Sequence, residues 1–230
     1  MMGVLGNEML WVPLVAQIDL VRYFADSNTA GKVVILVLSI LNCMAITIIW
    51  SKYQQLRRAK ALNLRDEKRI NDLASMSDFD KNDFKGTGSP YLQICSRAMD
   101  AARISAVGGK IRMNYVENAI RRALAEMEDL YESRMYVLAT IVSGAPFLGL
   151  LGTVWGVMDA FGTMESGGAT IEHLAPGVSG ALLTTVAALC VAIPIVFIYN
   201  NLSGMTRGEM TKLENFASNL ADRIELETNT

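Results

Sequence analysis

The chain has little charge, and three long stretches carry no charged residue at all. Only 19% of its 230 residues are Asp, Glu, Lys or Arg, whereas 51% are hydrophobic. This uneven pattern favours membrane-spanning segments over a large water-soluble core. The net charge of −2 also argues against a nucleic-acid-binding protein, which usually carries a clear basic excess.

Cysteine and histidine are equally scarce. The three cysteines, Cys43, Cys95 and Cys190, are odd in number and fit no metal-binding spacing, so we interpret them as small apolar fillers. The one histidine, His173, stands beside Glu172, and this pair offers too few ligands for a metal ion. The sequence shows no nucleophile–base pair and no phosphate loop either. We therefore expect that the protein is not an enzyme and has no cofactor and no metal site.

The three charge-free runs predict an all-α membrane protein with three transmembrane helices. The third run, 174–206, would form a helix about 50 Å long, which exceeds the thickness of a bilayer. We therefore expect spans two and three to continue as long helices into the cytoplasm. The predicted segments are 1–32 (N-terminal region with an amphipathic interfacial helix), 33–50 (span one), 51–134 (polar helical segment), 135–158 (span two), 159–173 (connector), 174–201 (span three) and 202–230 (C-terminal helix).

Basic residues set the predicted orientation. Residues 51–134 hold 16 Lys or Arg, seven of them soon after span one, whereas the 159–173 connector holds none. Because loops rich in Lys and Arg stay in the cytoplasm, the polar segment and the C-terminus are expected inside, and the N-terminus and connector in the periplasm.

Spans two and three each carry a face of small residues, which lets membrane helices approach closely. One interpretation is tight packing and nothing more, either between subunits or against a partner helix. The residues assigned to this packing are Gly149, Gly152, Gly156, Gly177, Gly180, Ala181 and Ala188.

Hydroxyl groups on the same faces open a second interpretation, a polar path for an ion or a partner side chain. Thr153 and Thr185 lie on the small faces, with Thr184 and Ser179 nearby. Such hydroxyls often bond only to their own helix. Prolines in the same spans, however, predict helix breaks that free backbone carbonyls; these prolines are Pro146, Pro176 and Pro194.

The spans lack any Asp, Glu, Lys, Arg or His. Intramembrane proton relays normally need an ionisable group. If this protein moves protons, a partner must therefore supply that group.

Two motifs resemble the ExbB/TolQ family, which is related to the flagellar stator protein MotA. Ala145-Pro-Phe-Leu-Gly-Leu-Leu-Gly-Thr-Val-Trp-Gly-Val-Met158 is similar to the second span of that family. Ala175-Pro-Gly-Val-Ser-Gly-Ala-Leu-Leu-Thr-Thr-Val186, with the following Val191-Ala-Ile-Pro194 and Tyr199-Asn200, is similar to its third span. The resemblance is strong over 136–201 and weak before it.

The resemblance implies a pentameric ring of three-span subunits in the bacterial inner membrane. The ring would surround single-span helices of an ExbD/TolR-type partner, usually two copies, whose membrane Asp carries the proton. Ion flow would move the partner helices and transmit work to the cell envelope. The family threonines that face the Asp correspond to Thr153 and Thr185. Nutrient uptake, envelope maintenance and gliding share this subunit design, so the resemblance leaves the process open.

The chain departs from the family at two positions. Many members have a Glu where this chain has Gly180, and an Ala is common where it has Thr184. Because hydroxyl and carbonyl oxygens can also replace water around sodium, a sodium-driven motor is the alternative to a proton-driven one. A membrane scaffold that packs through its small faces and conducts nothing is the third hypothesis.

Overall fold

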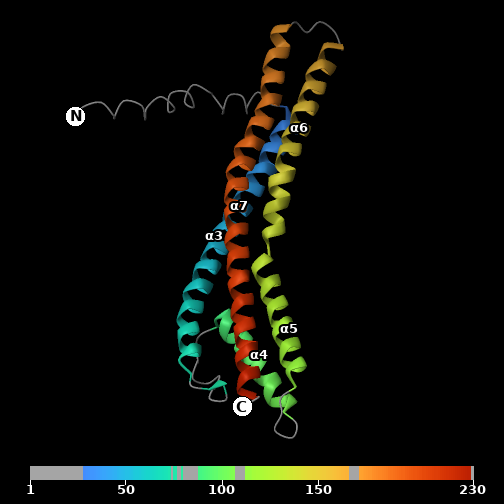
Figure 1. Ribbon diagram of the computed structural model, residues 1–230. Helices are drawn as coiled ribbons and strands as arrows, with labels where there is room; N and C mark the ends of the chain where they lie inside the picture. The colour runs from blue at the N-terminus through green and yellow to red at the C-terminus, as the bar shows by residue number, and fades with distance from the viewer. Residues whose placement is uncertain are drawn as a thin grey trace, which may run out of the picture. The chain divides into compact units, whose positions relative to one another are not determined.

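The computed structural model describes residues 28–73, 75–76, 79, 88–106, 112–165 and 171–228. The predicted interfacial helix within 1–32 and the centre of the connector therefore lie outside the described residues. The described chain folds into α3 (Thr29–Asn71), α4 (Pro90–Ser105), α5 (Met113–Glu132), α6 (Met135–Glu165) and α7 (Ile171–Thr228), shown in Figure 1. Three of its helical stretches are long and apolar enough to cross a membrane.

The three predicted spans belong to helices of different lengths. The first span, predicted over 33–50, lies within one helix of 43 residues, α3. The third span continues as predicted, in a helix of 58 residues, α7. The second span, in contrast, begins at Met135 and is separated from α5 by a short break.

The chain divides into two compact units. The first, which we call the apolar unit, comprises Met1–Ile46 and Leu138–Phe197; the second, the polar unit, comprises Thr47–Val137 and Ile198–Thr230. In the described part of the apolar unit, Val34 and Leu38 of α3 pack against Ala145 of α6 and Ala188 and Ala192 of α7. The outward faces of the same helices remain apolar, as Phe147 (71% exposed) and Phe197 (71%) illustrate. Such surfaces suit lipid or other membrane helices rather than water.

The polar unit is a bundle with a conventional buried core. Its α4 begins with a hydroxyl cap, in which Ser89 accepts from the Leu92 amide, and with Pro90 at the first helical position. The ring of Tyr91 stacks on that of Phe216 in α7 with centroids 4.2 Å apart. Arg223 of α7 donates to the Ile70 carbonyl at 3.2 Å and also to that of Leu73, and so satisfies the end of α3.

The break between α5 and α6 is built around a buried lysine. Arg134 adopts φ 66°, an unusual left-handed conformation for a side-chain-bearing residue. Lys52 of α3, only 2% exposed, donates from Nζ to the Leu130 carbonyl at 3.1 Å, to Ser133 Oγ at 3.4 Å and to Gln55 Oε1 at 3.2 Å. Burial, and then the Arg134 guanidinium, lower the pKa of the Lys52 ammonium. The ammonium therefore caps the carbonyl end of α5, where positive charge is favourable.

Candidate functional site

In the apolar unit, α6 and α7 approach so closely that glycine is required at three successive turns of α6. A Cβ added at Gly149 would lie 2.5 Å from the Ala188 Cβ, and one at Gly156 would lie 2.5 Å from the Ala181 Cβ. At Gly152 the added Cβ would lie 2.6 Å from the hydroxyl oxygen of Thr184. These distances are well below van der Waals contact, so the small-residue faces of the two spans meet each other within one chain.

Three threonine hydroxyls converge where the helices touch. Thr153 of α6 and Thr184 and Thr185 of α7 each place Oγ1 3.0 Å from the Gly149 carbonyl oxygen. The hydroxyls of Thr153 and Thr185 also contact each other directly, and those of Thr153 and Thr184 lie 3.5 Å apart. Thr184 further donates to its own Ala181 carbonyl at 2.7 Å. We call Thr153, Thr184 and Thr185 the threonine cluster.

The number of protons limits how the cluster can be bonded. Each hydroxyl has one proton to donate, whereas the Gly149 carbonyl has two lone pairs and, within a helix, already accepts a backbone N–H. The three hydroxyls therefore cannot all donate to it. Thr184 can donate to Ala181, one of Thr153 and Thr185 to Gly149, and the other to its neighbouring hydroxyl. In that arrangement every proton is used, and only hydroxyl lone pairs remain for a visiting group.

The cluster itself is uncharged. No Asp, Glu, Lys, Arg or His lies between Met135 and Met158 or between 174 and 206. The first carboxylate along α6 is Asp159, whose Oδ2 accepts from the Asn28 side-chain amide at 3.2 Å. Asn28 in turn caps α3 by accepting from the Gly31 amide at 2.8 Å. Any carboxyl, amino, guanidinium or imidazole group at the cluster must therefore come from outside these spans.

The structure brings together some of the predicted site residues and separates others. Thr153, Thr184 and Thr185 form one cluster, with Thr184 fully buried. Ser179 lies more than one turn before Thr184 and is partly exposed. Gly180 is buried, and a Cβ at Gly177 would lie 3.3 Å from the Ala160 Cβ. The predicted packing of these small residues against other subunits or a partner stays a prediction.

The prolines do not break their helices, contrary to expectation. Pro146 lies inside α6, and Pro176 and Pro194 lie inside α7, both of which continue through these positions. Each proline removes one backbone donor, and the bonds of the flanking turns are enough to hold the helix in an apolar setting. The carbonyl that the site uses, Gly149, is therefore presented by helix packing and not by a proline break.

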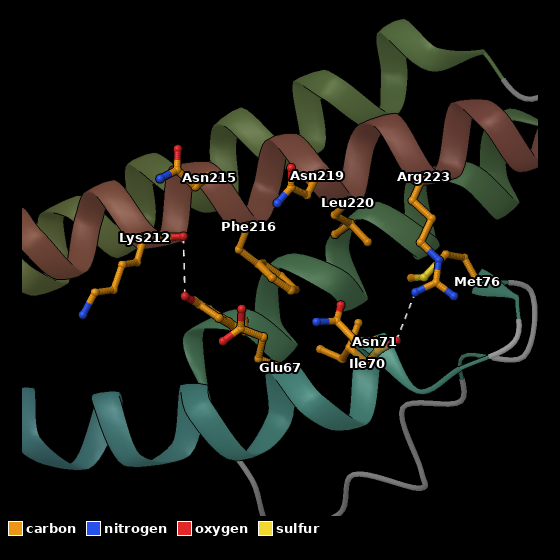
Figure 2. A pocket seen from close by; sticks show the side chains of 11 residues that line it. Glu67, Ile70, Asn71, Met76, Lys212, Asn215, Phe216, Asn219, Leu220 and Arg223 are labelled. Atoms are coloured by element: carbon orange, nitrogen blue, oxygen red, sulfur yellow. Dashed lines mark hydrogen bonds between the residues drawn. The ribbon is translucent and has the colours of Figure 1, made fainter.

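The polar unit contains a cavity, which is a second candidate site. It has a volume of about 240 Å³ and lies between α3 and α7. Asn215 and Asn219 of α7 and Glu67 of α3 are among its lining residues (Figure 2). Its cations are already engaged, since Lys212 donates to Glu209 at 2.8 Å and Arg223 to backbone carbonyls and to Glu227. Burial, followed by the carboxylates of Glu67 and Glu209, raises the pKa of the lining Tyr91 to about 12, which leaves it neutral near pH 7. The threonine cluster is the stronger candidate.

Comparison with known proteins identifies a family to which the chain is similar. The model of the MotA/TolQ/ExbB proton channel family matches residues 91–215, more than half of the chain. The chain is 39% identical to the biopolymer transport protein ExbB of Xanthomonas campestris pv. campestris over 146 residues, covering 58% of this chain and 56% of that protein. It is 41% identical to the Tol-Pal system protein TolQ of Pseudomonas aeruginosa over 99 residues, covering 43% and 42%.

A third relative is matched over more of its length. The chain is 30% identical to the biopolymer transport protein ExbB of Neisseria meningitidis serogroup B over 178 residues, covering 74% of this chain and 80% of that protein. The chain spans about half the length of the Xanthomonas and Pseudomonas relatives. The matched region of the family, 91–215, contains the whole threonine cluster.

Proposed function

Because the chain belongs to the MotA/TolQ/ExbB proton channel family, we propose that it is the ring subunit of an ion-driven motor in the bacterial inner membrane. In this proposal the subunit forms a pentamer around a single-span ExbD/TolR-like partner, present in two copies. Proton flow moves the partner helices, and the work reaches the cell envelope for outer-membrane transport or envelope integrity. The N-terminus lies in the periplasm and the C-terminus in the cytoplasm.

One observation carries this proposal: three hydroxyls converge in spans that hold no ionisable group. A carboxyl group on a partner helix would complete the site. Since the hydroxyl protons can be used within the cluster, its free lone pairs suit a group that donates a hydrogen bond. A protonated carboxylic acid is such a donor, whereas a carboxylate accepts only. The cluster thus favours the partner group in its protonated form.

The apolar exteriors of α6 and α7 support assembly with other membrane helices. Trp155 is 57% exposed and Val186 is 51% exposed in the single chain, beside the small-residue contact that the two helices share. Three glycines of α6 contact α7 within the chain, so large exposed side chains such as Trp155 and Val186 are available to a neighbouring subunit or a partner helix.

The test is to replace Thr153 or Thr185 with Val, which keeps the shape and removes the hydroxyl. We expect each variant, reconstituted with the partner, to lose most of its proton flux and motor-dependent function at normal protein levels. Thr211→Val is the matched control, because Thr211 is exposed and its hydroxyl donates back to its own helix, to the Arg207 carbonyl at 3.1 Å. Full flux in both cluster variants would rule out the proposed path.

A sodium-driven motor is the alternative, favoured by the group of hydroxyl and carbonyl oxygens around Gly149. Replacing sodium with choline in the flux assay separates the two ions. A proton-driven motor keeps its rate and is stopped by a protonophore. A sodium-driven one loses its rate in choline.

A non-conducting scaffold would explain the glycines by packing alone. It predicts that the threonine-to-valine variants function normally while variants that separate α6 from α7 fail. The motor hypothesis predicts that both groups of variants fail.

A further inference from the structure

Four buried side chains of the polar unit have polar atoms without a hydrogen-bond partner among the described residues. These atoms are Asn63 Nδ2, both carboxylate oxygens of Asp66, the Tyr131 hydroxyl and Thr206 Oγ1. Asn63 is 3% exposed, and Asp66 and Tyr131 are fully buried. More than nine in ten buried polar groups in proteins have a partner, and an isolated buried carboxylate is especially unfavourable. A molecule bound between these side chains would remove the penalty.

Asn63 and Asp66 form the centre of this group. They lie three residues apart on α3, so their backbones are separated by one turn and about 4.5 Å along the helix axis. The side-chain oxygen of Asn63, Oδ1, accepts from the backbone N–H of Tyr91 at 3.4 Å. This bond orients the Asn63 side chain and leaves its Nδ2 hydrogens for another acceptor. The carboxylate one turn further along α3 needs donors.

The Tyr131 hydroxyl of α5 extends the same group. Asn63 and the buried Glu209 of α7 both lie close enough to act on its pKa, but the hydroxyl has no hydrogen-bond partner of standard geometry among the described residues. Burial, and then the Glu209 carboxylate, raise the pKa of Tyr131 to about 12, while the nearby Asn63 acts in the opposite direction. The phenol is therefore neutral and can both donate and accept.

The mixture of unpaired donors and acceptors selects the ligand. A metal cation would satisfy Asp66 but could not accept from Asn63 Nδ2. Nor do the described residues contain any group of three or more His, Cys, Asp or Glu side chains that could hold a metal ion. Water accepts from an amide and donates to a carboxylate, and buried waters in proteins typically make two to four such bonds.

We propose that Asn63 and Asp66 bind ordered water inside the polar unit, with the Tyr131 hydroxyl as a further ligand. This site is independent of the motor function proposed above. It keeps the Asp66 carboxylate solvated inside the bundle, and the water links α3 to α5.

The first test compares two substitutions of Asp66 by thermal unfolding of the full-length protein. Asp66→Asn keeps an acceptor for the water and should change Tm by less than about 2 °C, whereas Asp66→Leu displaces the water and leaves Asn63 unpaired, so Tm should fall by roughly 5 °C. In a dry site the order is reversed, because Leu removes an unpaired carboxylate and Tm rises. A rise in Asp66→Leu therefore overturns the proposal. Asp100→Leu, at an exposed position of α4, is the control for a generic loss of charge.

Two further measurements hold even if Asp66→Leu fails to fold. A high-resolution cryo-EM map of the wild-type assembly should show water density within about 3.2 Å of both Asn63 Nδ2 and Asp66, and a well-resolved empty site contradicts the proposal. The Tm of the wild type should be equal in sodium, potassium and choline chloride at one ionic strength. A sodium- or potassium-specific rise that Asp66→Asn abolishes would replace the water with a cation.

Discussion

Substituting Gly149 with Ala tests the contact on which the threonine cluster depends. The added Cβ would lie 2.5 Å from the Ala188 Cβ, 3.0 Å from the Thr185 Cα and 3.1 Å from the Thr184 carbonyl oxygen. Carbon atoms in contact are normally about 3.5–4.0 Å apart, so α6 and α7 must separate by about 1 Å. That movement would stretch the 3.0 Å contacts from Thr184 and Thr185 to the Gly149 carbonyl beyond hydrogen-bonding distance.

The expected loss of stability follows from overpacking. Extra carbon in a well-packed interior costs about 1–3 kcal/mol. The gain in helix propensity from Gly to Ala, about 1 kcal/mol, offsets part of this. Gly144 lies on the same helix with nothing within 4 Å of an added Cβ, so Gly144→Ala receives the gain without the clash. Relative to Gly144→Ala, a penalty of about 2 kcal/mol lowers the Tm of Gly149→Ala by roughly 4–8 °C.

Thermal unfolding of the purified proteins in one detergent, followed by tryptophan fluorescence, measures this difference. The double variant Gly149→Ala/Ala188→Gly should recover part of the loss, because the nearest clash disappears while the two backbone contacts persist. A Gly149→Ala protein as stable as Gly144→Ala would refute the close packing of α6 and α7. In the flux assay, Gly149→Ala should also be impaired, since it displaces the acceptor shared by the threonines.

Three more predictions concern the polar unit. Lys52→Met removes the charged donor to the Leu130 carbonyl, to which Ser133 Oγ still donates at 2.7 Å, and should destabilise the fold by about 1–3 kcal/mol, seen as a lower Tm than that of a control Lys60→Met at an exposed position of the same helix. Burial opposes ionisation of Glu227, but hydrogen bonds from Ser75, Met76 and Arg223 outweigh it and lower its pKa. The resulting stability is present above the unfolded-state pKa of about 4.3 and is lost as the pH falls through the lower folded-state pKa, so Glu227→Gln should show a smaller drop in Tm on acidification. Burial raises the pKa of the Cys95 thiol to about 12, so in a Cys43→Ser/Cys190→Ser background, which removes the two exposed thiols, a maleimide at pH 8 should label Cys95 only after unfolding; rapid labelling of this native variant would contradict the burial of Cys95.

The helices were predictable where apolar periodicity was strong. The sequence predicts an apolar stripe on the C-terminal helix, of which Leu213, Phe216, Leu220 and Ile224 are buried in the polar unit and Met210 is partly buried. The stripe predicted on α5 comprises Tyr115, Ile120, Leu124, Met127 and Tyr131. Ile120, Met127 and Tyr131 are buried and Leu124 is partly buried, but Tyr115 is 56% exposed while its neighbour Val116 is buried. An aromatic ring with a hydroxyl tolerates either position, so hydrophobicity alone could not decide between these neighbours.

The break before Met135 had no such signal. Neither Gly nor Pro marks it, and Arg134 adopts its left-handed conformation where Lys52, 82 residues earlier, caps the end of α5. A tertiary contact of this kind has no local pattern in the sequence.

The candidate site was predicted in its side chains but not in its backbone. The spacing of small residues and the family resemblance both pointed to Thr153 and Thr185, which the structure places in contact. The Gly149 carbonyl, on which three hydroxyls converge, could not be predicted, because every residue has a carbonyl and only the close packing of α6 on α7 selects this one. Nor could the burial of Thr184, which is complete, be distinguished from that of its neighbour Thr185, which is partial.

The neutrality of the threonine cluster has a consequence for speed. A hydrogen bond to a neutral hydroxyl is roughly half as strong as one to a charged group, so the cluster holds a visiting acid weakly. Weak binding means a short residence time, and passage through a channel requires that a bound group leave as readily as it arrives. In the motor that we propose, this chain would therefore supply a surface for rapid exchange, and the energy of each step would be set by the charge that the partner gains or loses.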